Sequence, residues 1–431
     1  MSDVASPRSL SPKLVFTLLA LIAVGAVTFL VGALSSQPDL PQRAYRAFLQ
    51  NFLLWSALSQ GALMLSCGIR LTNGRWAGPI HRLVDSMAAF VPLSLVLYLV
   101  LWSGKTELFE WMTNAEEIAG KEWWYSQGFM LFRDLFALAW MTALSGWYLW
   151  LSVRPMLGPA RETSTGWKKS IIAIWTSGWR GEAAERSLAD RRCRKLAAVL
   201  ALSYAFAYST LGVDLVMGLA PHWVSTMFPA YYAWGGFLSA VSMTALVAVL
   251  MRNSPELRGQ VTETRRHDMG KMVFAFSIFW MYLFWSQYLV IYYGNVPEET
   301  SFVIARLGSQ FIQDTQHGAF WERIQEPYVR TTLFTWILCW VIPFWVLLGQ
   351  RAKKTPAILG AVTFGSVVGF WLERYVLVTP SLVPPERVLA GAPDTLGLME
   401  LGVTAGFAGL FFLCFFLFAR VFPGALPLQR T

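Results

Sequence analysis

The chain has 431 residues, of which 55% are hydrophobic and only 14% are charged. Soluble domains usually carry about 25% charged residues, so this composition excludes an ordinary soluble enzyme and indicates a lipid environment. The net charge of +9 is not a sign of nucleic-acid binding, because we expect most basic residues to mark one side of a membrane.

Long apolar stretches recur along the chain, each close to the ~20 residues that a membrane-spanning helix needs. We therefore predict an all-α, polytopic membrane protein with about ten transmembrane helices. The first stretch is longer than the roughly 7–15 apolar residues of a signal peptide, so we expect a retained anchor. The stretches are residues 14–34, 48–69, 84–103, 129–152, 196–220, 230–251, 271–292, 330–349, 356–378 and 398–419.

Basic residues are concentrated on one side of this predicted topology. With ten spans both termini lie on the same side, and that side collects most of the 35 Lys and Arg residues. The segment between spans 4 and 5, residues 154–195, is the most basic, and residues 167–175 have the aromatic and basic anchors of an interfacial helix. The positive-inside rule places this side, and both termini, in the cytoplasm.

The opposite loops carry more acidic than basic residues, mainly at 107–122 and 298–326. Such a face could dock or steer a basic partner. It could equally be a solvated acidic rim that follows from the charge bias of the topology.

Spans 2–5 and spans 6–9 look like two copies of a four-helix unit. The first helix of each unit ends at an arginine, Arg70 or Arg252, and the fourth carries a carboxylate shortly before a proline, Asp214 or Glu373. An even number of helices per unit predicts parallel repeats related by an axis along the membrane normal, with spans 1 and 10 peripheral. The predicted divisions are 1–47 (N-terminus and span 1), 48–229 (first bundle), 230–397 (second bundle) and 398–431 (span 10 and C-terminus).

Five ionisable residues fall inside predicted spans, where a charge costs several kcal/mol and is a functional candidate. They are Arg133, Asp134, Asp214, Glu373 and Arg374. Neighbours along a helix point about 100° apart, so we expect Arg133 not to pair with Asp134, and Arg374 not to pair with Glu373. One possible pair across helices is Arg133 with Asp214.

Span 7 adds polar groups near the same level. Gln287, Tyr288 and Tyr292 follow an aromatic run, and the two tyrosines share a helix face. Together with Arg133, Asp134 and Arg374, they suit a quinone head group, which needs hydrogen-bond donors, flat apolar walls and a proton acceptor. The alternative is an interfacial aromatic belt with structural ion pairs.

A second polar set lies near the basic side, and together its residues could form a proton-entry path. Helix capping and contact with lipid head groups explain the same residues. The set consists of Gln60, His81, Asp85, His267, Asp268 and Lys271.

The cysteines and histidines argue against a metal or haem held by this chain. Cys67, Cys193, Cys339 and Cys414 form no CxxC or ferredoxin spacing. A membrane haem b needs axial ligands inside the bundle, whereas His81, His222, His267 and His317 fall in predicted loops or at helix ends.

Several runs resemble one family. Residues 214–226, followed by Tyr231, resemble the joint between bundles in the NrfD-type (polysulfide-reductase-like) membrane subunits of alternative complex III. Residues 267–271 and 286–300 resemble the smaller of its two such subunits, the ActF type, often called the second quinone-binding subunit. The resemblance covers spans 2–9 and also includes Pro343-Phe344, residues 351–354 and Glu373-Arg374-Tyr375.

The resemblance implies a subunit, not catalytic alone, of a bacterial inner-membrane complex that oxidises menaquinol or ubiquinol. Its partners would be a larger paralogous subunit, periplasmic iron–sulfur and multihaem cytochrome c subunits, and a cytochrome c or terminal oxidase as acceptor. Asp214 would accept the proton, Glu373 would be a second relay, and Gln287 and Tyr292 would bind the head group. The alternatives are a proton-conducting subunit without quinone and a scaffold that docks partners through its acidic loops.

Overall fold

The computed structural model describes residues 10–74, 76–78, 80–254, 257–308, 324–389 and 396–422. Regular structure in these ranges is helical, with no β-strand, and ten of the helical segments are long and apolar enough to cross a membrane. The predicted all-α polytopic fold is therefore confirmed, and the chain is a multi-pass membrane protein. Each predicted stretch coincides with an observed one to within about two residues or lies inside it.

Eight spans contain one continuous α-helix each, because a helix satisfies every backbone polar group without water. They are α1 (Pro12–Ala33), α2 (Leu40–Leu71), α6 (Gln127–Val153), α9 (Glu182–Leu215), α10 (Phe228–Leu250), α11 (Glu263–Gly294), α17 (Pro356–Leu382) and α19 (Leu398–Val421).

The other two spans change their winding part-way. The third span consists of α3 (Ile80–Met87), a 3-10 turn (Ala88–Phe90) and α4 (Val91–Ser103), and the change occurs just before Pro92. The eighth consists of α14 (Val329–Trp336), a π-helical turn (Ile337–Val341) and α15 (Ile342–Leu348), with Pro343 in the first turn of α15. Proline lacks the N–H that a continuous α-helix would use, which accounts for both positions.

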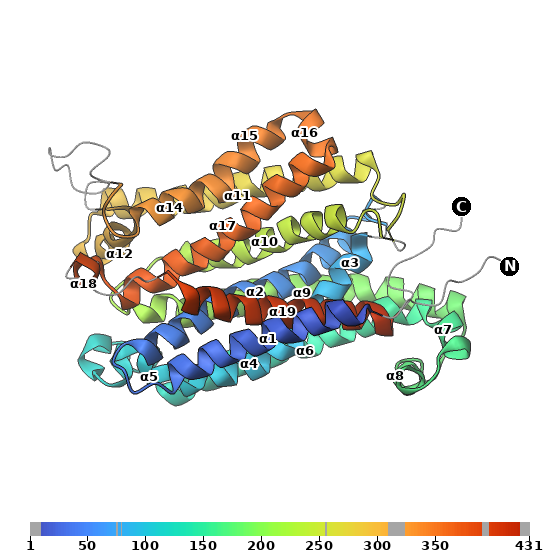
Figure 1. The fold of residues 1–431 in the computed structure, drawn as a ribbon, viewed down its shortest axis with the longest axis horizontal. Helices are drawn as coiled ribbons and strands as arrows, with labels where there is room; N and C mark the ends of the chain where they lie inside the picture. Colours follow the sequence, from blue (N-terminus) through green and yellow to red (C-terminus); the bar gives the residue numbers. More distant parts are fainter. Residues whose placement is uncertain are drawn as a thin grey trace.

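Short helices connect the spans and define two ends of the molecule (Figure 1). We call the end with α5 (Lys105–Leu108), α12 (Pro297–Leu307) and α18 (Pro385–Leu389) the acidic end. We call the end with α7 (Gly158–Thr163), α8 (Trp167–Trp175) and α16 (Gln350–Lys354) the basic end. Part of the predicted acidic rim, residues 309–323 including His317, lies outside the described residues.

The two predicted bundles pack by the same pattern of neighbours. In the first, α2 contacts α4, α4 contacts α6, α6 contacts α9, and α9 returns to α2. In the second, α10 contacts α11, α11 contacts α15, α15 contacts α17, and α17 returns to α10. The central helices α2 and α10 pack against each other, and one hydrophobic core runs through both bundles. This pattern supports the predicted repeat, whose symmetry axis stays a prediction.

The first and last spans form an antiparallel pair on the side of the bundles (Figure 1). Glycines bring the two backbones together, since a Cβ atom on Gly406 would lie 2.8 Å from the Cα of Gly25, and one on Gly409 would lie 2.9 Å from the carbonyl oxygen of Leu18. Small residues drive such close helix packing in membranes. The remainder of α1 is largely exposed, as expected for a peripheral span.

Replacing Gly406 with leucine should destabilise the protein by about 1–3 kcal/mol, because the new side chain would overlap the α1 backbone. Thermal unfolding of the purified chain in detergent measures the effect. Gly146→Leu is the matched control, since nothing lies within 4 Å of a Cβ at that mid-helix position. Equal melting temperatures for the two variants would contradict a tight α1–α19 interface.

Candidate functional site

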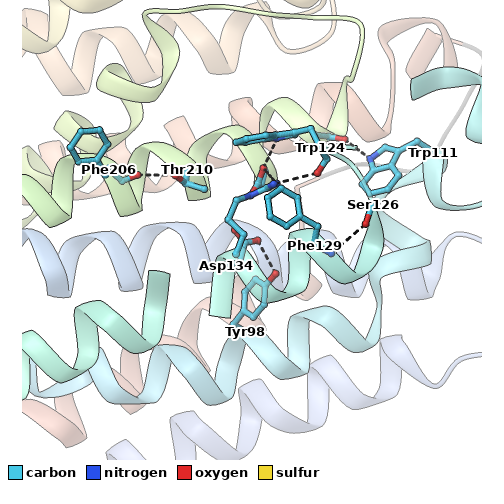
Figure 2. A network of polar contacts seen from close by, with 11 residues as sticks. Tyr98, Trp111, Trp124, Ser126, Phe129, Asp134, Phe206 and Thr210 are labelled. Atoms are coloured by element: carbon cyan, nitrogen blue, oxygen red, sulfur yellow. Dashed lines mark hydrogen bonds and ion pairs between the residues drawn. The ribbon is translucent and has the colours of Figure 1, made fainter. Parts of the chain in front are cut away.

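The first cluster of buried charges lies near the acidic end of the first bundle and is centred on the ion pair of Arg133 and Asp214 (Figure 2). Arg133 of α6 donates two hydrogen bonds to the Asp214 carboxylate of α9, from Nε at 2.7 Å and from Nη2 at 2.6 Å. This is the pair across helices that the sequence suggested. The Asp214 side chain is fully buried, so the bidentate pair compensates a charge that water cannot reach.

Asp134, the next residue of α6, points to a different partner. Its Oδ2 accepts a 2.7 Å hydrogen bond from the Tyr98 hydroxyl of α4 (Figure 2). The residue is fully buried, and its Oδ1 has no hydrogen-bond partner among the described residues. As expected, Asp134 does not pair with Arg133.

A loop at the acidic end closes over this cluster. Trp124 donates a 3.1 Å hydrogen bond from Nε1 to Asp214, and its ring lies 3.8 Å from the Arg133 guanidinium carbon (Figure 2). Trp111 and Lys121 bind the carbonyl oxygens of Gly218 and Pro221, just beyond α9. Asp214 is therefore covered as well as paired.

The second cluster, in the other bundle, differs because it lines an apolar cavity of about 400 Å³. The cavity lies between α10, α11, α12, α14 and α17 near the acidic end. Its walls are mostly aromatic and aliphatic, as in cavities that hold small organic ligands. The aromatic, polar and charged residues of its wall include Tyr231, Trp280, Gln287, Tyr288, Arg306, Thr332 and Glu373.

Glu373 of α17 forms an ion pair with the adjacent Arg374, at 2.8 Å between Oε2 and Nη1, and both side chains are buried. Our expectation that these neighbours do not pair is wrong. Both side chains are long and flexible. The angle of about 100° between the directions in which they leave the helix therefore does not keep their charged ends apart. Arg374 also donates to the carbonyl oxygen of Tyr232 at 3.3 Å and lies over the Tyr232 ring.

This ion pair leaves hydrogen-bonding capacity unused. Neither carboxylate oxygen of Glu373 has a hydrogen-bond partner of good geometry among the described residues, although the Tyr231 hydroxyl is near enough to interact with it, and Nε and Nη1 of Arg374 also lack such a partner. The indole N–H of Trp280 and the hydroxyl of Thr332 in the cavity wall are likewise unpaired within the described ranges. Unsatisfied buried polar atoms are rare, so such a group facing a cavity is a candidate for ligand contact.

Arg306 of α12 adds a cation to the same cavity. Its guanidinium donates to the carbonyl oxygens of Val376 and Leu377 and to the hydroxyl of Ser381, at 2.7–3.0 Å. Burial lowers the pKa of Arg306 to about 9, which leaves it protonated at neutral pH. These bonds join α12, which forms part of the cavity wall, to the last turns of α17.

The structure divides the predicted quinone-site residues between the two clusters. Gln287 and Tyr288 line the cavity with Glu373, and Arg374 lies directly behind it. Tyr292 stacks on Tyr288 but is 45% exposed and outside the cavity wall. Arg133, Asp134 and Asp214 belong to the first cluster.

Sequence reasoning missed Tyr231, Trp280, Thr332 and Arg306 as residues of the cavity wall. Each is a residue type that is common at membrane interfaces or in helices, and no spacing marks it. The π-helical turn next to Trp336, another wall residue, had no sequence signal beyond Pro343. Such turns are frequent at functional sites.

A third polar cluster lies in the first bundle toward the basic end and is centred on Ser66 of α2. The Ser66 hydroxyl donates to Asp85 at 2.7 Å and also contacts His81 and Tyr148 at 2.9 and 3.0 Å. Ser152 bridges Asp85 and Arg70, which completes a connected network.

The other predicted proton-path residues do not join this network. Gln60 pairs with Ser145 one to two turns further into the bundle. Asp268 and Lys271 form a 2.7 Å ion pair on α11, and His267 lies beside Lys271 at the start of that helix. The predicted set is therefore three separate groups.

Within the described ranges, no three His, Cys, Asp or Glu side chains gather as a metal site would need. The fold and the buried clusters define a multi-pass helical membrane protein with charged residues inside two bundles. No protein-family model matches the chain, and a search of curated proteins finds no match.

The ion pair of the first cluster gives a stability prediction. Arg133→Met should destabilise the protein by about 3–5 kcal/mol, because Asp214 would keep a buried, poorly compensated charge. Adding Asp214→Leu should recover much of this loss, because the second change removes that charge. Chemical unfolding in detergent measures the free energy of unfolding of both variants.

Arg387→Met is the control, since it breaks an exposed arginine–carboxylate pair with Asp39 and should have little effect. A double variant at Arg133 and Asp214 that is no more stable than Arg133→Met would contradict a dominant role for the ion pair.

Proposed function

We propose that this chain is a membrane subunit of a quinol:electron-acceptor oxidoreductase and that the cavity of the second bundle binds the quinol head group. The observation that carries the proposal is the Glu373 carboxylate in the wall of the apolar cavity of about 400 Å³, which is ion-paired with Arg374 but has no hydrogen-bond partner of good geometry among the described residues. Hydrocarbon does not tolerate such a group without a purpose.

The cavity has the chemistry that a quinol requires. A quinol hydroxyl donates a hydrogen bond, for which Glu373 supplies the acceptor. A quinone carbonyl accepts one, for which the Trp280 N–H and the Gln287 amide are donors in the wall. Tyr231 and Trp280 offer flat faces for the ring, and their centroids are 5.5 Å apart. Ligand pockets typically combine such walls with a few polar groups.

Oxidation of one quinol yields a quinone, two protons and two electrons. Glu373 accepts the first proton, and its ion pair with Arg374 stabilises the carboxylate that must receive it. The second proton leaves on water at the acidic end. The two electrons pass to a redox centre of a partner subunit.

The proposed setting is the bacterial inner membrane, with the basic end and both termini in the cytoplasm, as the positive-inside rule favours. The quinol, menaquinol or ubiquinol, would then react on the periplasmic side. The partners would be iron–sulfur and multihaem cytochrome c subunits and a larger paralogue, as in the NrfD-type subunits of alternative complex III that the sequence resembles. A terminal oxidase would be a further acceptor.

We therefore assign the proposed role of proton acceptor to Glu373 rather than to Asp214. Asp214 already accepts three hydrogen bonds from Arg133 and Trp124 and lies under a loop. Ligands must displace those bonds to reach it, whereas Glu373 already faces a cavity.

Glu373→Gln tests the proposal, because the amide keeps the size of the side chain but cannot accept the proton. Quinol oxidation by the native complex in membranes should fall by about 10²–10⁴-fold, the usual contribution of a general base. Labelling with a photoreactive quinone, followed by mass spectrometry, should still modify α11, α14 or α17 peptides.

Glu298→Gln is the control, because it removes the same charge from an exposed position on α12. Full turnover by Glu373→Gln would exclude Glu373 as the base. Labelling that avoids the cavity helices would refute quinone binding there.

A second candidate function is proton conduction without quinone, and the network around Ser66 favours it. The network links Asp85, His81 and Tyr148 inside the first bundle and reaches a pocket at the basic end. Asp134 and Asp214 lie further along the same bundle, toward the acidic end.

Asp85→Asn should then abolish proton flux into proteoliposomes that contain the native complex, measured with a pH-sensitive dye inside the vesicles. Glu162→Gln, exposed on α7, is the control and should leave the flux unchanged. Unaltered flux in Asp85→Asn would exclude this path. Normal flux together with normal turnover in Glu373→Gln would favour a scaffold that only docks partners.

A further inference from the structure

A pocket of about 340 Å³ opens at the basic end of the first bundle and belongs to neither cluster near the acidic end. It lies between the start of α3, the end of α6 and the first half of α9. A water molecule occupies about 30 Å³ of liquid, so the pocket has room for a polyatomic ion with bound water. Its walls are formed by Arg70, Gly78, His81, Arg82, Ser152, Pro155, Met156, Arg186, Ala189 and Asp190.

The pocket carries a net positive charge. Arg70, Arg82 and Arg186 line it, whereas Asp190 is the acidic residue in its wall. Asp190 lies 3.5 Å from Arg70, and Glu182 lies 2.9 Å from Arg186 on the exposed side of α9, so two of the three cations have an ion-pair partner. Asp85 attracts Arg82, and Arg82 and Arg186 are close enough to repel each other. An anion between them would turn this repulsion into attraction.

Arg82 is the cation least compensated by the protein. Within the described part of the chain, its guanidinium makes no hydrogen bond and no ion pair, although the residue is only partly exposed. Arg70, in contrast, is held in place by Tyr148 and Ser152 at 3.0 and 2.7 Å. The pocket therefore combines Arg70, whose guanidinium is held in place by hydrogen bonds, with Arg82, whose guanidinium donors are available to a ligand.

Neighbouring elements place the pocket at the level of lipid head groups. Met156 of its wall is followed by α7 and α8, and α8 has one buried side chain, Ile172, among exposed residues such as Trp167 and Ile174. Such a helix lies in the membrane interface. Figure 1 shows α7 and α8 beyond the ends of the spans at this end. Basic pockets between helices at this depth bind phosphorylated head groups.

We propose that this pocket binds a phosphate-bearing anion, which Arg82 and Arg186 contact directly and to which Arg70 adds a third cation in the pocket wall. Guanidinium groups match the paired oxygens of a phosphate, and their charge does not depend on pH in the physiological range. The phosphate can come from an anionic phospholipid or from a free phosphate compound. The proposal is independent of quinol binding at the acidic end.

The test uses the full-length protein in nanodiscs and two ligands. In one arm, native mass spectrometry counts the lipids retained after reconstitution in phosphatidylcholine with or without phosphatidylglycerol. In the other, thermal unfolding in phosphatidylcholine nanodiscs is followed during titration with inorganic phosphate. The double variant Arg82→Gln/Arg186→Gln should lower the affinity for the effective ligand by at least about tenfold.

The matched control is Arg191→Gln/Arg192→Gln, which removes the same charge from exposed positions of α9 outside the pocket. Arg82→Lys provides a folding control, because it keeps the charge and should retain part of the affinity. Retention of phosphatidylglycerol alone identifies a lipid site, and stabilisation by phosphate identifies a free-anion site. Binding of neither ligand, or an equal loss in the Arg191/Arg192 control, would overturn the proposal.

Discussion

The cost of burying ionised groups in an apolar medium governs how both bundles are built. A carboxylate in hydrocarbon must be paired, hydrogen-bonded or protonated, and each solution requires particular neighbours. In the first bundle, Arg133 and Trp124 saturate Asp214. In the second, Arg374 neutralises Glu373 without satisfying its hydrogen bonds. The Asp214 carboxylate therefore has its hydrogen-bonding capacity filled by the protein, whereas the Glu373 carboxylate can still accept hydrogen bonds from a ligand in the cavity.

The contrast between the bundles has a simple geometric origin. Asp214 lies one residue before the end of α9 and Glu373 lies nine residues before the end of α17, and their arginines come from different positions. Arg133 approaches from a separate helix and fills the space beside Asp214. Arg374 reaches Glu373 from the same helix, so the space beside the carboxylate stays open as the cavity.

Hydropathy alone predicted the ten spans, because the length and apolarity of a membrane helix are fixed by the bilayer. The pair of Arg133 and Asp214 was also accessible, since both are intramembrane charges on helices expected to be neighbours. The pair of Glu373 and Arg374 could not be predicted, because adjacent residues point in different directions from a helix and only the length of these two side chains lets their charged ends meet. Tyr292 fell outside the cavity although it shares a face with Tyr288, since the width of a cavity depends on how the helices pack. Ser66 and Ser152 carry no signal, as serine is common in membrane helices.

The close packing of α1 and α19 at Gly25, Gly406 and Gly409 has a consequence for the insertion of the chain into the membrane. In the order of synthesis α1 is made long before α19, so it waits in the bilayer without its closest neighbour until α19 has been inserted. At about 5–20 residues per second, the wait lasts on the order of 20–70 s. During that time its glycine-lined face is open to lipid or to an insertion factor. Completion of the α1–α19 interface is thereby tied to the synthesis of α19, and products truncated before α19 would keep α1 without its partner.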